Sequence, residues 1–253
     1  MIQNTYLLYQ GPSLFNGEDI SVVITGLTVP SSNRKTGPII QSWILSGSEK
    51  PTEAVKSGAD ASVCGSCPLR GSSCYVNLVG VNNIWENIDN LQKVDSDVLE
   101  IIRRYSGLGL RLGSYGDPAM VPLEVWTPLI NASKFVVGYT HQWRTCDQRW
   151  QQYLQASVES IEDMYEANRM GWATYRVKLK DDSPEPGETV CINQTNKYIK
   201  CNTCRLCNGK KNIVVDVHGA AFKLNNFKKL IKQWQTIQPV ITRRSGATSA
   251  GIL

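Results

Sequence analysis

The hydrophobic and polar positions of the chain follow two periods in turn. Short runs rich in Val, Ile and Tyr, such as 19–29 (DISVVITGLTV) and 172–179 (WATYRVKL), are typical of strands. Between them, apolar residues recur every three or four positions, which is typical of helices. The pattern predicts strands at 19–29, 38–45, 107–113, 134–140, 172–179 and 212–217, and one around 153–156 within 149–157. It predicts two helices within 84–105, and one each at 122–132, 161–170 and 225–238, the last stopped by Pro239.

This order of elements predicts the fold class. Strands separated by helices indicate a parallel sheet in an α/β fold, either open or curled into a partial or complete (β/α) barrel. In such folds the chemistry gathers at the carboxyl ends of the strands. With 253 residues, 42% of them apolar, the chain can form one large domain. We expect an α/β barrel over 1–224 and a basic helix with a loose tail over 225–253.

The sequence also predicts a compartment. No run reaches the roughly 18 apolar residues of a membrane span, and residues 1–10 lack the basic start and apolar stretch of a signal peptide. We therefore expect a cytoplasmic protein that does not enter the membrane. In a reducing compartment, cysteines are more often metal ligands or nucleophiles than disulfide partners. The eight cysteines are therefore the most informative residues in the sequence.

Four cysteines form a group late in the chain. Cys191 is followed by Cys201, Cys204 and Cys207, a C-x9-C-x2-C-x2-C pattern. Zinc sites usually take paired C-x2-C units. Three cysteines at C-x2-C-x2-C suit a cuboidal iron–sulfur cluster, whose irons are separated in space. The spacing favours one [4Fe–4S] cluster over zinc, which remains the alternative.

Three further cysteines lie earlier. Cys64, Cys67 and Cys74 follow C-x2-C-x6-C in a Gly/Ser-rich loop. They suit a cluster with one open iron, a cluster that borrows a ligand from elsewhere, or zinc. Cys146 stands alone and is typical of a buried, unliganded residue. The sequence thus predicts one or two clusters and leaves their number open.

Several short motifs resemble those of a known family. Residues 111–118 (RLGSYGDP) follow a predicted strand and are similar to the Gly-Gly-Glu-Pro loop of radical S-adenosylmethionine (SAM) enzymes. Residues 155–162 (QASVESIE) resemble a later strand of that barrel, and Tyr75 resembles the aromatic neighbour of its last cluster cysteine. The motifs NRKTG, CGSCPLR, GYTHQW and VHG occur in the same order as in a family of phage-encoded proteins. The chain resembles that family, a divergent relative of the radical SAM barrel.

The resemblance implies roles for individual residues. It places Gly116, Asp117 and Pro118 at the amino group of SAM, and Ser157 in a strand facing the cofactor. The chain differs from the family in one respect, since C-x2-C-x6-C replaces the usual C-x3-C-x2-C. The resemblance therefore implies SAM as a candidate cofactor and identifies no reaction.

Both histidines follow predicted strands. His141 comes after 134–140 and His218 after 212–217, so a barrel would bring both to its active end. Each is a candidate to ligate a metal, move a proton or hydrogen-bond a cluster sulfur, or is an ordinary histidine at a strand end. Asp117 either binds a cationic group or caps the helix that begins near Pro118. Arg176 is expected in a structural salt bridge rather than facing an anion.

Charge is distributed unevenly. Residues 197–253 carry eleven Lys and Arg and one acidic residue, a net charge of +10, within a chain of +5. This part is suited to nucleic acid, or it offsets an anionic cluster. The sequence predicts a phage-type iron–sulfur protein with redox or SAM-linked chemistry on an unknown substrate. The expected partner is an unknown small molecule or a reductant. A zinc-stabilised protein that binds nucleic acid is the alternative.

Overall fold

The computed structural model describes residues 3–31 and 33–245, and gives side chains for all of these except 105–106 and 234–245. The predicted loose tail over 246–253 lies outside the described residues. Ten strands fall into two five-stranded sheets in this part of the chain. The first sheet contains β1 (Thr5–Pro12), β2 (Asp19–Thr25), β3 (Ile40–Ser46), β4 (Leu110–Tyr115) and β5 (Val136–Val137). The second has the order β6 (Tyr139–Thr140), β7 (Gln155–Val158), β8 (Thr174–Lys178), β10 (Ile213–Asp216) and β9 (Thr189–Val190).

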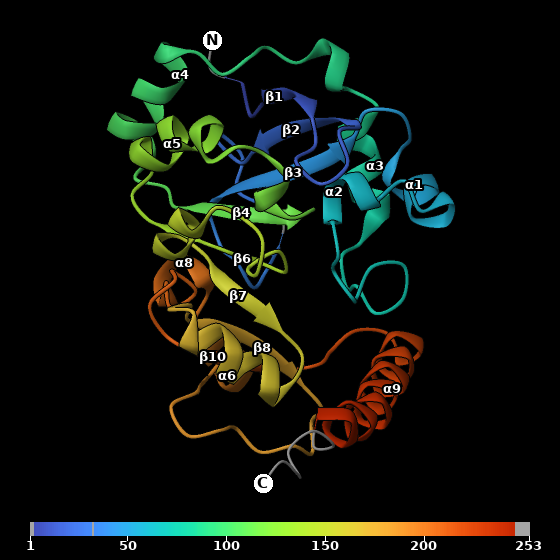
Figure 1. Ribbon diagram of the computed structural model, residues 1–253. Helices are drawn as coiled ribbons and strands as arrows, with labels where there is room; N and C mark the ends of the chain where they lie inside the picture. The colour runs from blue at the N-terminus through green and yellow to red at the C-terminus, as the bar shows by residue number, and fades with distance from the viewer. Residues whose placement is uncertain (1–2, 32, 246–253) are drawn as a thin grey trace, which may run out of the picture.

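The strand directions confirm an α/β fold with parallel sheets. From β3 through β4, β5, β6, β7 and β8 to β10, every paired strand is parallel to its neighbour. β1 and β2 precede this series and pair antiparallel, and β1 was not predicted from the sequence. Within the described residues, no pairing joins β1 to β9, so the sheets do not close and the complete barrel was wrong. Figure 1 shows the first sheet in the upper half of the molecule and β7, β8 and β10 in the lower half.

A single glycine separates the two sheets. The predicted strand 134–140 is present, but Gly138 divides it into β5 and β6. A Cβ at Gly138 would lie 2.8 Å from Leu154 Cδ2 and 2.9 Å from the Leu112 carbonyl oxygen. Its N–H donates to the carbonyl of Cys207 at 2.9 Å instead of to a neighbouring strand. We call this break between the two sheets the crease; here the Cys207 carbonyl takes the place of a neighbouring strand as the partner of the Gly138 N–H.

The helices largely follow the predicted pattern. Asp95 accepts a hydrogen bond from Val98 N at 2.9 Å and so starts a helix where two were expected to meet. The last helix continues through Pro239, so the predicted stop was wrong: a proline removes one backbone hydrogen bond but need not end a helix. The helices are α1 (Pro51–Ser57), α2 (Ala61–Cys64), α3 (Leu78–Trp85), α4 (Ser96–Ile101), α5 (Leu123–Ala132), α6 (Ile161–Arg169), α7 (Ile192–Thr195), α8 (Cys201–Cys204) and α9 (Ala221–Ser245).

Shorter helical segments join these elements. A π-helical turn follows α4, and a 3₁₀ turn precedes β7, which overlaps the strand predicted around 153–156 and begins two residues later. The segments are Ile88–Asn90, Ile102–Ser106, Pro118–Met120 and Gln148–Gln152. No helix among the described residues combines the length and hydrophobicity that crossing a membrane requires.

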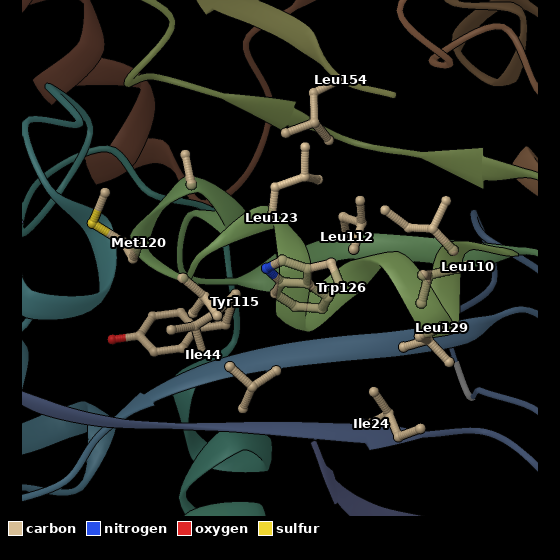
Figure 2. Close-up of a cluster of buried hydrophobic side chains, with 14 of the residues drawn as sticks. Ile24, Ile44, Leu110, Leu112, Tyr115, Met120, Leu123, Trp126, Leu129 and Leu154 are labelled. Carbon is tan, nitrogen blue, oxygen red and sulfur yellow. The ribbon is translucent and has the colours of Figure 1, made fainter. Parts of the chain in front are cut away.

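Two apolar clusters hold the fold together. The larger one packs α5 against the first sheet, with Trp126 fully buried and its Nε1 donating to the Pro118 carbonyl at 3.1 Å (Figure 2). The smaller one brings Leu69, Tyr175 and Phe227 together. Since Leu69 follows Cys67 and Phe227 lies on α9, this cluster ties the first cysteine loop and the basic helix to the second sheet.

Candidate metal centre

The first cysteine group lies in the loop that follows β3. Cys64 is the last residue of α2, and the Cys67 N–H donates to its carbonyl at 3.2 Å, so one tight turn presents both thiols. Burial raises the pKa of Cys64 well above its ordinary value, and the charges of Cys67 and Cys74 raise it further. The pKa of Cys74 is raised by burial and by Cys67. The three predicted ligands are therefore mutual neighbours.

The loop after β4 supports this group. Gly116 has φ +79°, a conformation that favours glycine, and the Asp117 N–H donates to the Val63 carbonyl at 2.7 Å. Val63 directly precedes Cys64. Pro118 begins the 3₁₀ turn that follows. The Gly-Asp-Pro motif thus contacts the helix that carries the first cysteine.

Both oxygens of Asp117 accept hydrogen bonds from the backbone. Oδ1 accepts from Ala119 N at 3.0 Å, which caps the short helix as one of the two sequence interpretations predicted. Oδ2 accepts from His141 N at 2.8 Å. Burial raises the pKa of this carboxyl, although these hydrogen bonds oppose the shift. Asp117 therefore fixes the backbone of His141.

His141 lies beside a cysteine, as its predicted strand-end position suggested. Its Nε2 is 3.8 Å from Cys67 Sγ and 2.8 Å from Glu159 Oε1. Burial alone would lower the pKa of His141, but Cys67 and Glu159 raise it well above the ordinary value. Sequence reasoning missed Glu159, whose position immediately after β7 was the available signal.

Two further polar residues line the same end of the strands. Ser157 is buried within β7, as the resemblance expected of a strand residue. Gln142, which was not predicted, accepts from Ser66 Oγ at 2.9 Å and donates to the Cys64 carbonyl at 3.3 Å. The cysteine turn is therefore fixed from the strand side.

The second cysteine group brings four thiols together. The charges of Cys201, Cys191 and Cys204 each raise the pKa of Cys207, after burial as the larger cause. After burial, the charges of Cys191 and Cys204 likewise raise the pKa of Cys201, and the charge of Cys204 raises the pKa of Cys191. In each of the six pairs of these four predicted ligands, the charge of one cysteine therefore raises the pKa of the other.

This second group lies at the opposite ends of the strands. Cys201 N donates to the Lys35 carbonyl at 3.0 Å, in the segment that leads into β3. Figure 1 shows α8 at the starting ends of β4 and β6, whereas α2 lies near the arrowhead of β4. Only the first group therefore lies at the carboxyl ends of the strands, where the sequence analysis expected the chemistry.

Two cations face the second group. Burial lowers the pKa of Lys35, and the charges of Cys191 and Cys201 oppose that shift. The positive charge of Arg111 lowers the pKa of Cys201 and of Cys207, although burial raises both. No carboxylate pairs with Arg111 within residues 3–31 and 33–245; its Nη2 lies 3.5 Å from Tyr139 Oη. An anionic group between the four thiols would be the counter-charge that Arg111 lacks.

A column of tyrosines joins the two groups. Tyr75, next to Cys74, shares a 2.6 Å hydrogen bond between its hydroxyl and that of Tyr139. Tyr139 stacks on Tyr175 with 4.5 Å between ring centroids. Burial raises the pKa of Tyr175, and the charges of Cys207 and Cys191 raise it further. His218 packs its ring 4.8 Å from that of Tyr75, and its Nδ1 lies 3.1 Å from the Asp216 carbonyl oxygen.

Two expectations concern residues outside the groups. Cys146 packs against the larger apolar cluster, and burial raises its pKa to about 12. Arg176 forms the expected salt bridge, with Glu188 at 2.6 Å.

The donor sets can be compared with the expected cofactors. Among the described residues, no three His, Cys, Asp or Glu side chains converge closely enough to hold a single metal ion. A cuboidal cluster binds each thiolate to a different iron, so neighbouring thiols that do not converge on one point fit it. Two observations within the described residues fit an anionic group beside the cysteines. Near the first group, the buried hydroxyl of Tyr115 has no hydrogen-bond partner. Near the second group, Arg111 has no carboxylate partner.

Comparison with known proteins adds no assignment. No protein-family model, curated protein or solved structure matches the chain.

Proposed function

We propose that the protein is an iron–sulfur protein in which each of the two cysteine groups holds a [4Fe–4S] cluster. The observation that carries the proposal is that Cys191, Cys201, Cys204 and Cys207 lie within range of one another's charges, although Cys191 is ten residues from Cys201 in the sequence. Cys191 and Cys207 also pack against the same apolar cluster. The facing cations Lys35 and Arg111 support it, because a cluster with four thiolates is anionic.

The first group has a different role in the proposal. Cys64, Cys67 and Cys74 leave one iron without a protein thiolate, and the Gly-Asp-Pro loop resembles that of radical SAM enzymes. When bound, such a cluster takes up and releases single electrons. Glu159 Oε1, 2.8 Å from His141 Nε2, keeps that imidazole beside Cys67, whose Sγ lies 3.8 Å from the same nitrogen. We propose SAM or another small molecule as the ligand of this end of the strands.

Metal analysis tests the proposal directly. Wild-type protein purified without oxygen should be brown and contain about eight iron and eight sulfide per chain, as expected for two cubanes. Cys204→Ala and Cys67→Ala should each lose about half of the iron while keeping the fold. Cys146→Ala is the matched control, because this half-buried thiol belongs to neither group, and the iron content of the variant should equal that of the wild type.

The alternative has distinct outcomes. A colourless protein with stoichiometric zinc would contradict the proposal and favour the zinc-stabilised nucleic-acid binder. The observation in favour of that function is the segment 189–215, which has five cations and no carboxylate. If the protein has this function, its affinity for nucleic acid should fall steeply as the salt concentration rises, because phosphate contacts release counterions.

A further inference from the structure

One buried hydroxyl near the first cysteine group has no protein partner. Tyr115 is the last residue of β4 and is 3% exposed, yet its hydroxyl makes no hydrogen bond within the described part of the chain. Tyr6 is equally buried, and its hydroxyl accepts from Gln3 N at 2.9 Å. A buried polar group without a partner costs about 1–3 kcal/mol. The hydroxyl of Tyr115 is therefore placed for an acceptor that is not a side chain or backbone group of the described residues.

The surroundings of this hydroxyl indicate what the acceptor is. Figure 2 shows the oxygen of Tyr115 at the margin of the apolar cluster, turned away from Trp126. The cysteine turn is close to the end of β4: the N–H of Asp117, two residues after Tyr115, donates to the carbonyl of Val63, directly before Cys64, at 2.7 Å. The charges of Cys64 and Cys74 also raise the pKa of Tyr115, after burial as the larger cause. The other nearby anion, Asp60, is already paired with Arg70 at 3.2 Å.

We propose that Tyr115 donates a hydrogen bond to a sulfur atom of the cluster that Cys64, Cys67 and Cys74 hold. The proposal rests on the function proposed above and assigns a positioning residue to that site. His141 lies beside Cys67, with its Nε2 3.8 Å from the sulfur, so side chains that follow or end two strands, β6 and β4, lie next to the first group. Hydrogen bonds to the sulfurs stabilise the more negative, reduced state and raise the reduction potential.

The test is a comparison of two tyrosines. Tyr115→Phe removes the hydroxyl and keeps the ring, and Tyr6→Phe does the same at an equally buried site away from the cysteines. We expect Tyr115→Phe to shift the midpoint potential of the first cluster to a more negative value at full iron content. Tyr6→Phe should leave it at the wild-type value. A redox titration followed by electron paramagnetic resonance measures both, and the Cys204→Ala variant assigns the signal to the first group.

A second measurement does not depend on the phenylalanine variant. Incorporating 3-fluorotyrosine at position 115 strengthens the donor while keeping the ring, so the potential should shift the opposite way. Unchanged potentials in Tyr115→Phe and in the fluorinated protein, both brown and fully loaded, would overturn the role of Tyr115 alone. A wild type that binds no iron would overturn the proposed function and this inference with it.

Discussion

Replacing Gly116 with alanine should destabilise the protein through a specific steric conflict. With φ at +79°, Gly116 adopts a conformation that side chains rarely take. An added Cβ would lie 2.6 Å from Ile44 Cβ, 3.0 Å from the Ile44 carbonyl oxygen and 3.1 Å from the Val63 carbonyl oxygen. Two of these three atoms belong to the backbone of β3 and α2, so they have little freedom to move.

The cost can be worked out from these two effects. The left-handed conformation costs about 1–2 kcal/mol for a residue with a Cβ, and overpacking costs about 1–3 kcal/mol. Together they give roughly 2–5 kcal/mol for Gly116→Ala. Gly58 is the matched control, because its φ is +89° but no atom lies within 4 Å of an added Cβ. Gly58→Ala should therefore cost only the first, smaller amount.

Urea denaturation of the two variants measures the difference. The unfolding midpoint can be followed by fluorescence, since Trp126, Trp143, Trp150 and Trp172 are fully buried. Iron content should fall only in Gly116→Ala, because displacement of the loop also moves Asp117 and the backbone of His141. Equal losses of stability in the two alanine variants would refute the steric reasoning.

Two other perturbations have expected outcomes. Glu188→Ala leaves the guanidinium of Arg176, 3% exposed, without its partner and should cost about 3–5 kcal/mol in denaturant. The double change Arg176→Met with Glu188→Leu should cost clearly less, and an equal cost would contradict the ion-pair account. Removing iron with a chelator and an oxidant should lower the melting temperature of the wild type, because a ligand bound only by the folded state stabilises it. An unchanged melting temperature would count against bound clusters.

The fold was predictable where its elements are locally encoded. Helix α5 begins and ends within a residue of the predicted range, because its apolar residues follow a helical period. Strand β1 was missed because its buried residues are adjacent rather than alternating, so it lacks the period of a strand. The crease at Gly138 depends on the Cys207 carbonyl, which is far away in the sequence. No local pattern contains such a contact.

The candidate site was predictable to the same extent. Cysteine spacing predicted two groups of thiols, and the cysteines of each group affect one another's pKa in the fold. Cys64 and Cys67 are close because residues three apart share one tight turn. Glu159 and Gln142 were missed, since a single polar residue after a strand is typical of a solvent-facing position. Their importance comes from His141 and Cys64, residues that only the folded sheet brings beside them.

The crease at Gly138 has a consequence for how the protein opens. Its N–H is bonded to Cys207 at 2.9 Å, while its carbonyl accepts from Gln155 N at 3.1 Å. One peptide segment thus ties the loop of the second cysteine group to β7 across the boundary of the sheets. The loop and the sheet edge should therefore exchange their amide hydrogens as one cooperative unit rather than as a fraying loop on a rigid support. The slow exchange of a single amide, that of Gly138, reports on both.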